Sequence, residues 1–281
     1  MRIGIDSYSY HRMLGDLRPG EVASRIQLAD GGAAVLREVR TIRGVDGVAL
    51  QTCYLNRAHR DALSALRGQA NGFELVLSWG APNGIEFGRS GNAVEDLFSW
   101  IEVAASLGIR TMRIVAGGPA LRDRAGDWRA AVPPLRRAAE RARSLGLVLA
   151  LENHGDLTAR EIDHLLEEVA DDSLGVCFDT GNALRVGDDV ATAAKLLAPF
   201  IRMVHLRDSE PIETVRDGVA GPRSVAYGSG VIPLDAVLST LARLGFDGLV
   251  CVELGQLGPE EDERELIARC VRWLQLRIET T

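Results

Sequence analysis

The strongest constraint on the fold is a regular alternation of short apolar runs with longer segments of helical periodicity. The runs are rich in β-branched residues and end in polar or glycine positions, which is typical of strands. Their hydrophobicity is continuous rather than alternating, so we expect a sheet buried on both faces, as parallel sheets are. The runs lie near residues 2–6, 47–51, 73–79, 111–117, 147–153, 174–180, 201–207 and 248–254.

The segments between these runs place leucine, alanine, valine or isoleucine at the i, i+3, i+4 and i+7 spacing of an amphipathic helix. Several end on a glycine where a helix C-cap is expected, as at Gly108, Gly146 and Gly245. Glycines interrupt the first segment, within 19–43, so we place its helix after about residue 33. The other segments lie at 58–70, 93–108, 130–146, 158–170, 189–200, 234–245 and 262–277.

Eight strand–helix units predict a (β/α)8 TIM barrel, in which a parallel sheet closes on itself and helices cover it. The chain of 281 residues agrees with the length of about 250 that is typical of this fold. An open doubly wound sheet is the alternative, but no GxGxxG sequence follows any of the runs. No linker or low-complexity segment divides the chain. We therefore expect one domain over residues 1–281, with a long connection at about 207–232 after the seventh strand.

The composition excludes several classes of partner. A net charge of -7 and a pI of about 5.4 leave no basic surface for nucleic acid or an anionic membrane. The four cysteines form no CxxC pair, which favours a reducing compartment over a disulfide scaffold or a zinc ribbon. The amino terminus lacks the apolar core of a signal peptide, and no run reaches the roughly 18 apolar residues of a membrane span. We expect a cytoplasmic protein.

Four consecutive predicted strands end in polar residues, namely Glu152, Asp179, His205 and Glu253. The first two steps between them are 27 and 26 residues, about one strand–helix unit each. Because the active site of a TIM barrel lies at the carboxyl ends of its strands, we expect these side chains to meet there. Three crowded carboxylates repel one another, and a divalent cation would relieve the repulsion. Carboxylate oxygens with one imidazole suit Mn²⁺ or Mg²⁺, with Co²⁺ and Zn²⁺ as alternatives.

The residues two positions before these ends face the same way along each strand. They are Ala150, Cys177, Met203 and Cys251, and their small or apolar side chains predict a core layer beneath the polar one. We therefore interpret Cys177 and Cys251 as packed thiols rather than metal ligands. The competing interpretation of the polar ends is that each acid caps a helix or joins a surface ion pair.

The sequences LENHGD, CFDTGN, HLRD and VELG, in this order and spacing, resemble the sugar phosphate isomerase/epimerase family of xylose-isomerase-like TIM barrels. The similarity extends over essentially the whole chain. It implies that Glu152, Asp179, His205 and Glu253 hold the divalent cation of the family. It does not fix the substrate, because the family includes ketose 3-epimerases, aldose-ketose isomerases, inosose dehydratases and 3-dehydroshikimate dehydratases.

The resemblance implies a metal-dependent isomerase or epimerase of a sugar or related polyhydroxy ketone. Chelation of a carbonyl and a neighbouring hydroxyl would acidify the adjacent C–H, and an enediolate would form. Glu152 and Glu253 would act on opposite faces of the substrate, one removing the proton and the other returning it. The alternative is a dehydratase of an inosose, 3-keto sugar or dehydroshikimate-like substrate, with His154 as its proton donor or as a hydrogen-bonding residue.

Residues at the ends of the early runs are expected to line the pocket as hydrogen-bonding and stacking groups, namely Asp6, Tyr8, Gln51 and Trp79. Arg207 lies two positions after His205 and faces inward if the strand continues. Its guanidinium suits a hydroxyl, carboxylate or phosphate group of the substrate, and an ion pair with Asp208 is the alternative.

Asn182 stands where many members of the family carry a histidine that contacts the substrate. An amide cannot act as an acid or base near neutral pH, which puts the ketose epimerase substrates in doubt. The long connection contains further candidates for a lid or a phosphate cradle, namely Arg223, Tyr227, Gly228 and Gly230.

Two functions of other classes are also considered. A DNA-repair endonuclease resembling the endonuclease IV branch needs three zinc ions and several more histidines, but the chain has five, of which His59 and His164 fall on predicted helices. A non-catalytic sugar-binding module is disfavoured, because such a module would not need the complete set of four metal ligands. The expected partner is a small polyol or sugar, and a homodimer stays open because no sequence feature decides the oligomeric state.

Overall fold

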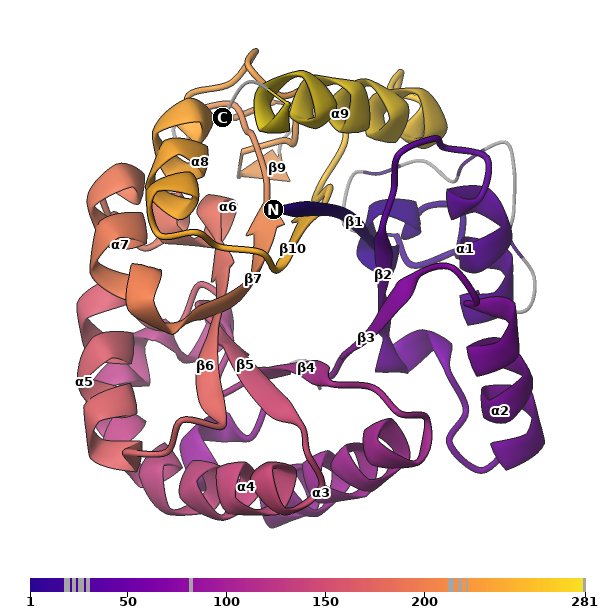
Figure 1. Ribbon diagram of the computed structural model, residues 1–281. Coiled ribbons are helices and arrows are strands. Elements are labelled where there is room, and N and C mark those ends of the chain that lie inside the picture. Colours follow the sequence, from indigo (N-terminus) through magenta and orange to yellow (C-terminus); the bar gives the residue numbers. More distant parts are fainter. Residues whose placement is uncertain are drawn as a thin grey trace.

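In the computed structural model, eight parallel strands close into a barrel, and helices cover its outside (Figure 1). The strand order around the barrel is β1-β10-β7-β6-β5-β4-β3-β2. The prediction of a (β/α)8 TIM barrel is therefore confirmed. The structure describes residues 1–17, 21, 24, 28, 31–80, 83–211, 215–216, 219–220 and 222–279. Within these ranges, no helix has the length and apolar character needed to cross a membrane.

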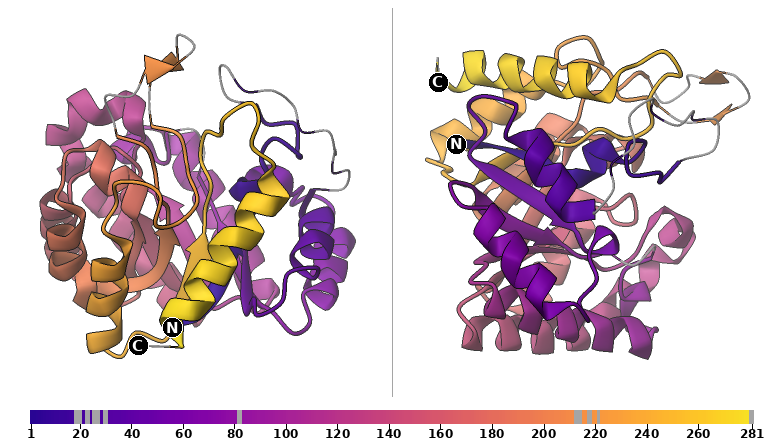
Figure 2. Two further views of the ribbon diagram at one scale, coloured as in Figure 1. Left: turned by 90° about the horizontal axis from the view of Figure 1, so that it is seen from above. Right: turned by 90° about the vertical axis from the view of Figure 1, so that its right-hand side faces the viewer.

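The barrel strands coincide with the eight apolar runs. They are β1 (Arg2–Asp6), β2 (Gly47–Gln51), β3 (Glu74–Ser78), β4 (Thr111–Val115), β5 (Val148–Glu152), β6 (Leu174–Asp179), β7 (Ile201–Leu206) and β10 (Leu249–Val252). The long connection after β7 holds two further strands, β8 (Val215–Arg216) and β9 (Val219–Ala220), which pair antiparallel. This pair, which the sequence did not predict, projects from the end of the barrel where the strands end (Figure 2). Residues 212–214, 217–218 and 221 of the connection lie outside the described residues.

The predicted amphipathic helices follow the strands in chain order. The α-helices are α1 (Gly31–Val39), α2 (Arg60–Gln69), α3 (Gly91–Ser106), α4 (Val132–Ser144), α5 (Ala159–Val169), α6 (Thr180–Arg185), α7 (Val190–Leu197), α8 (Leu234–Arg243) and α9 (Glu263–Ile278). Short 3-10 helices cover Ser7–Tyr10, Thr52–Tyr54, Glu86–Gly88, Pro119–Ala131 and Ala198–Phe200. The glycines predicted to end helices have positive φ angles, as a left-handed C-cap requires: +66° at Gly108, +74° at Gly146 and +66° at Gly245.

Among the α-helices of the described residues, one was not predicted. The six-residue α6 starts directly after β6, and Asp179 is its N-cap. The Oδ1 atom of Asp179 accepts a hydrogen bond from the backbone N–H of Asn182 at 2.8 Å. Asp179 is therefore a helix cap through its Oδ1 atom, as the competing interpretation of the acids proposed. Its Oδ2 atom does not take part in the cap and can bind other groups.

The inside of the barrel has an apolar layer beneath a polar one. The apolar layer consists of Ala49, Val76, Ala150, Cys177, Met203, Leu249 and Cys251. The predicted core layer is thus confirmed, and both Cys177 and Cys251 are buried in it. Above it lies a layer of buried polar side chains, to which each barrel strand contributes one residue. Seven of these residues lie within their strands, and Glu253 follows β10 directly. They are Asp6, Gln51, Ser78, Arg113, Glu152, Asp179, His205 and Glu253.

The strand register explains how these polar residues reach one depth. Asp179 pairs with His205, whereas Glu152 pairs with Cys177, two residues before Asp179. His205 in turn pairs with Cys251, two residues before the next polar end. Barrel strands are tilted against the barrel axis, so residues at the same height are not always paired in the strand register. Because every second residue faces inward, the inward-facing residues of two neighbouring strands at one height are either paired directly or offset by two residues. The polar residues therefore share a layer although they are not all in register.

Candidate metal centre and active site

The four polar residues predicted as metal ligands converge inside the barrel. One ligand atom from each of Glu152, Asp179, His205 and Glu253 lies within 4.8 Å of the others, and all four residues are buried. The Nδ1 atom of His205 lies 3.3 Å from Oε2 of Glu253 and 3.5 Å from Oε2 of Glu152. Strands β5, β6 and β7 and the residue after β10 thus bring three carboxylates around one imidazole.

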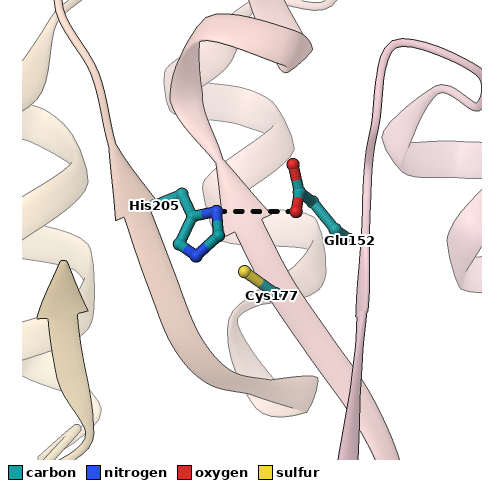
Figure 3. A group of neighbouring side chains, drawn as sticks. All are labelled: Glu152, Cys177 and His205. Atoms are coloured by element: carbon teal, nitrogen blue, oxygen red, sulfur yellow. Dashed lines mark ion pairs between the residues drawn. The ribbon is translucent and has the colours of Figure 1, made fainter. Parts of the chain in front are cut away.

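Cys177 lies close to this cluster from the layer below. Figure 3 shows its sulfur beside the His205 ring and near the Glu152 carboxylate, whose ion pair with the ring is drawn as a dashed line. Burial raises the pKa of the Cys177 thiol to about 12, so it carries a proton at neutral pH. The Sγ atom of Cys177 lies within 4.8 Å of ligand atoms of Glu152 and His205, and its place in the apolar layer supports its interpretation as a packed thiol.

Two buried arginines contact the carboxylates of the cluster. The Nε atom of Arg113 on β4 donates to Oε2 of Glu152. The Nη2 atom of Arg207 donates to Oδ2 of Asp179 at 2.8 Å and to Oε2 of Glu253. The sequence analysis expected Arg207 to bind the substrate or Asp208, not the acids of the cluster. It did not identify Arg113 as a residue of the site. The available signal for Arg113 was a single charge within an apolar strand, which must find a partner when it is buried.

Burial and neighbouring charges shift the pKa values of the acids in opposite directions. Burial by itself raises the pKa of Glu152, but the charges of Arg113 and His205 outweigh it and hold this pKa well below its usual range. Burial raises the pKa of Asp179 to about 7, although the charge of Arg207 opposes this increase.

Asn182 connects two of the predicted ligands. Its side-chain amide donates to Oδ2 of Asp179 at 2.8 Å and to Oε1 of Glu152 at 3.1 Å. The residue lies in the first turn of α6, so the helix that Asp179 caps also places this amide. Asn182 thus orients the carboxylates as well as facing the pocket.

Glu253 of the cluster also lines a cavity of about 450 Å³, a volume within the range of small-molecule sites. The predicted residues Tyr8, Gln51, His154, Asn182 and Arg207 line it together with Glu253. Further lining residues, which were not predicted, are Asp16, Cys53, Gly80, Arg113, Pro119 and Arg185.

His154 is a neutral hydrogen-bonding group of the cavity. Burial lowers the pKa of its imidazole to about 4, so the ring is uncharged at neutral pH. Its Nδ1 atom is buried and has no hydrogen-bond partner among the residues that the structure describes. A polar atom of this kind in a cavity wall is available to a ligand.

Two predicted pocket residues are placed elsewhere. The carboxylate of Asp6 is completely buried, binds protein donors and does not line the cavity within the described ranges. The side chain of Trp79 is also buried, and its Nε1 atom donates to Oδ2 of Asp96 on α3 at 2.8 Å. The assignment of both residues as substrate contacts is therefore corrected. For Trp79 the reason is strand parity, because Ser78, one position earlier, is the residue that faces inward.

In the connection after β7, Asp208 binds the backbone N–H groups that were expected to form a phosphate cradle. The Oδ2 atom of Asp208 accepts the backbone N–H groups of Gly228 and Gly230, both at 2.9 Å. A phosphate cradle formed by these glycines is therefore excluded in this structure. The predicted alternative of an Arg207–Asp208 ion pair is also replaced, since Arg207 pairs with the acids of the cluster. Arg223 is not among the described residues that line the cavity.

The donor set fits a divalent cation. Both ring nitrogens of His205 are buried and have no hydrogen-bond partner among the described residues, although carboxylates surround the ring. Three carboxylates and one imidazole are ligands that Mn²⁺, Mg²⁺ or Zn²⁺ accept. The cluster therefore combines two unsatisfied imidazole nitrogens with three carboxylates in one buried space.

The sequence profile of the family described as Xylose isomerase-like TIM barrel matches residues 36–276. The chain belongs to this family. Two curated relatives illustrate the range of reactions among similar proteins. An inosose dehydratase from Geobacillus kaustophilus is 30% identical over 142 residues, which cover 46% of each chain. A putative L-ribulose-5-phosphate 3-epimerase, SgbU, from Escherichia coli is 27% identical over 183 residues, which cover 64% of this chain and 63% of the relative.

The chain thus spans less than two thirds of the length of either curated relative. Among solved structures, the fold is similar to that of the IOLI protein with a bound zinc atom, with a TM-score of 0.73 and 20% identity. That comparison covers 100% of this chain and 99% of the other. It supports the fold, and its low identity carries no assignment of the reaction.

Proposed function

We propose that the protein is a divalent-metal-dependent isomerase or epimerase of a sugar or related polyhydroxy ketone, acting through an enediolate. The observation that carries this proposal is the convergence of four buried ligand atoms within 4.8 Å, one of whose residues, Glu253, lines a cavity of about 450 Å³. The similarity to sugar-modifying enzymes of the family supports the same class of reaction.

Glu152, Asp179, His205 and Glu253 would hold the cation, with Mn²⁺ or Mg²⁺ as the first choice and Co²⁺ or Zn²⁺ as alternatives. When bound, such an ion polarises a carbonyl group and stabilises negative charge on its oxygen. The arginines then have a separate task, which is to orient the carboxylates rather than to replace the cation.

Each of the two proposed catalytic carboxylates is held by its own arginine. Arg113 contacts Glu152 and Arg207 contacts Glu253, so both acids have a fixed orientation. The pKa values of both are held below their usual range, with burial opposed by these guanidinium charges, so both acids are ionised at neutral pH. One carboxylate removes the proton next to the substrate carbonyl. The other, once protonated from solvent, returns a proton to the opposite face and inverts that carbon.

The remaining polar groups of the cavity are proposed to orient the substrate. Tyr8, Gln51 and Asn182 present hydrogen-bonding groups to hydroxyls, and Arg207 presents a guanidinium beside Glu253. The amide of Asn182 already binds two carboxylates, so it can position groups but transfer no proton.

A dehydratase is the second candidate, and His154 is the observation that favours it. His154 lines the cavity, its Nδ1 atom has no hydrogen-bond partner among the described residues, and its neutral ring can hydrogen-bond a β-hydroxyl that leaves as water. The inosose dehydratase among the relatives is consistent with this outcome. Proton removal by a carboxylate is common to both reactions.

One experiment tests the function and separates the two candidates. The purified protein is incubated with Mn²⁺ and a panel of ketoses, inososes and 3-keto sugars in D₂O, and the products are followed by NMR and mass spectrometry. An isomerase or epimerase incorporates deuterium at carbon without loss of mass, whereas a dehydratase releases one water.

Two substitutions test the proposed bases in the same assay. Glu152→Gln and Glu253→Gln should each reduce turnover by about 10²- to 10⁴-fold, the usual contribution of a general base. Glu102→Gln is the matched control, because Glu102 lies on the exposed surface and pairs with Arg141. Full activity of both barrel variants would contradict the assignment of the two carboxylates.

A further inference from the structure

Asp6 ends β1 inside the barrel, and protein groups occupy its carboxylate from two sides. Its Oδ1 atom accepts the backbone N–H of Tyr8 at 2.7 Å and the side-chain amide of Gln51 at 3.1 Å. Its Oδ2 atom accepts the hydroxyl of Ser78 at 2.9 Å. These donors fix the position of a completely buried acid that does not line the cavity within the described residues.

The imidazole of His205 lies between Asp6 and the carboxylates of the cluster. Its Nε2 atom is 3.4 Å from Oδ2 of Asp6. Its Nδ1 atom is 3.3 Å from Glu253 and 3.5 Å from Glu152. The two nitrogens therefore face different acids, and the cluster lies on the Nδ1 side of the ring.

A histidine that binds a metal ion uses one ring nitrogen and usually donates the N–H of the other to a carboxylate or carbonyl. We propose that Asp6 is a positioning residue, which accepts the Nε2 proton of His205 and so presents the Nδ1 lone pair to the cation. The inference rests on the proposed function, because it requires a cation at the cluster. Asp6 would act through His205 and contact neither cation nor substrate.

The surroundings of Asp6 explain why a carboxylate is needed at this place. The backbone N–H of Tyr8 is a fixed donor, so an asparagine would keep its oxygen on that side. Its NH₂ group would then face Ser78 and the Nε2 atom of His205. A donor opposite Nε2 favours the tautomer with its proton on Nδ1, which is the nitrogen that must be free to bind the cation.

The first test is the affinity of the metal-free protein for Mn²⁺, measured by titration calorimetry and by the electron paramagnetic resonance of free Mn²⁺. Asp6→Asn should bind Mn²⁺ about 10- to 100-fold more weakly, as is typical when the outer partner of a ligating histidine is lost. Ser78→Ala is the matched control, because it removes one donor to the same carboxylate but keeps the charge, and should change the affinity far less. Thermal melting without metal verifies that each variant is folded.

The second test needs no variant. In the zinc-loaded protein labelled with ¹⁵N-histidine, the metal-bound ring should coordinate through Nδ1 and carry its proton on Nε2. Binding through Nε2 would overturn the proposal even if Asp6→Asn failed to fold. Equal Mn²⁺ affinity of Asp6→Asn and the wild type would overturn it while leaving the metal centre intact. If the wild type binds neither Mn²⁺ nor Zn²⁺, the metal centre of the proposed function fails as well.

Discussion

Replacement of Asp208 by asparagine tests how the connection after β7 is attached to the barrel. The carboxylate of Asp208 is buried and accepts four backbone N–H groups. Its Oδ2 atom binds Gly228 and Gly230, both at 2.9 Å, and its Oδ1 atom binds Ser209 at 3.0 Å and Ile232 at 3.3 Å. One side chain therefore organises the last part of the connection before α8.

The expected loss follows from the number of acceptors. Asparagine has one acceptor oxygen, and its NH₂ group would face two of the N–H donors. Two hydrogen bonds to a charged group are then lost, and each contributes about 1.5–3 kcal/mol, or about 3–6 kcal/mol together. Because about 1.4 kcal/mol corresponds to a factor of ten, even the lower value raises the detached population of the connection about a hundredfold.

Hydrogen exchange under native conditions measures this detachment directly. The amides of Gly228 and Gly230 should exchange about a hundredfold faster in Asp208→Asn, while the amides of β5 and β6 stay protected. Asp235→Asn is the matched control, because Asp235 lies at the exposed start of α8 and pairs with Arg277 at the surface. Equal exchange of both glycines in Asp208→Asn and in the wild type would refute the assigned role of the carboxylate.

Three further outcomes are expected. Arg113→Met removes the buried partner of the Glu152 carboxylate, so the metal-free variant should lose about 3–5 kcal/mol in urea unfolding, whereas the exposed Arg141→Met should unfold like the wild type. An unchanged midpoint and slope for Arg113→Met would contradict this. Thr158→Ala breaks the capping box of α5 and should cost about 1 kcal/mol in the same assay, most of which serine restores; equal losses for alanine and serine would exclude the cap as the cause. Mn²⁺ at about 100 times its dissociation constant should stabilise the wild type by about 2.7 kcal/mol. Asp179→Asn, which keeps a helix-capping oxygen but loses the charge, should gain far less stability from Mn²⁺, and an equal gain would count against Asp179 as a ligand.

Local patterns were sufficient to predict the barrel and to select the residues of the polar cluster. A buried strand needs a continuous apolar run, and a helix end often needs a glycine, so both can be recognised without knowledge of distant contacts. The spacing of Glu152, Asp179 and His205 by about one strand–helix unit placed them at one end of the barrel. Their convergence then follows from closure of the sheet.

The direction and partners of individual side chains were harder to predict. Ser78 and Trp79 are adjacent, and the strand parity that turns one inward and the other toward α3 is set by pairing with neighbouring strands. Asp6 resembled a pocket residue in the sequence, and only the closed barrel shows it buried beside His205.

Residue spacing suggested that Arg207 faces inward but did not identify the partners of Arg113, Arg207 or Asp208, because each partner depends on the geometry of strands or loops far away in the chain. Arg207 and Asp208 are neighbours in the sequence, yet one reaches into the barrel and the other binds the backbone of the connection. The sequence alone therefore determined the fold and the chemistry available at the strand ends, since both follow from local residue patterns. The tertiary structure determined which carboxylate each arginine holds, because this depends on register and barrel closure.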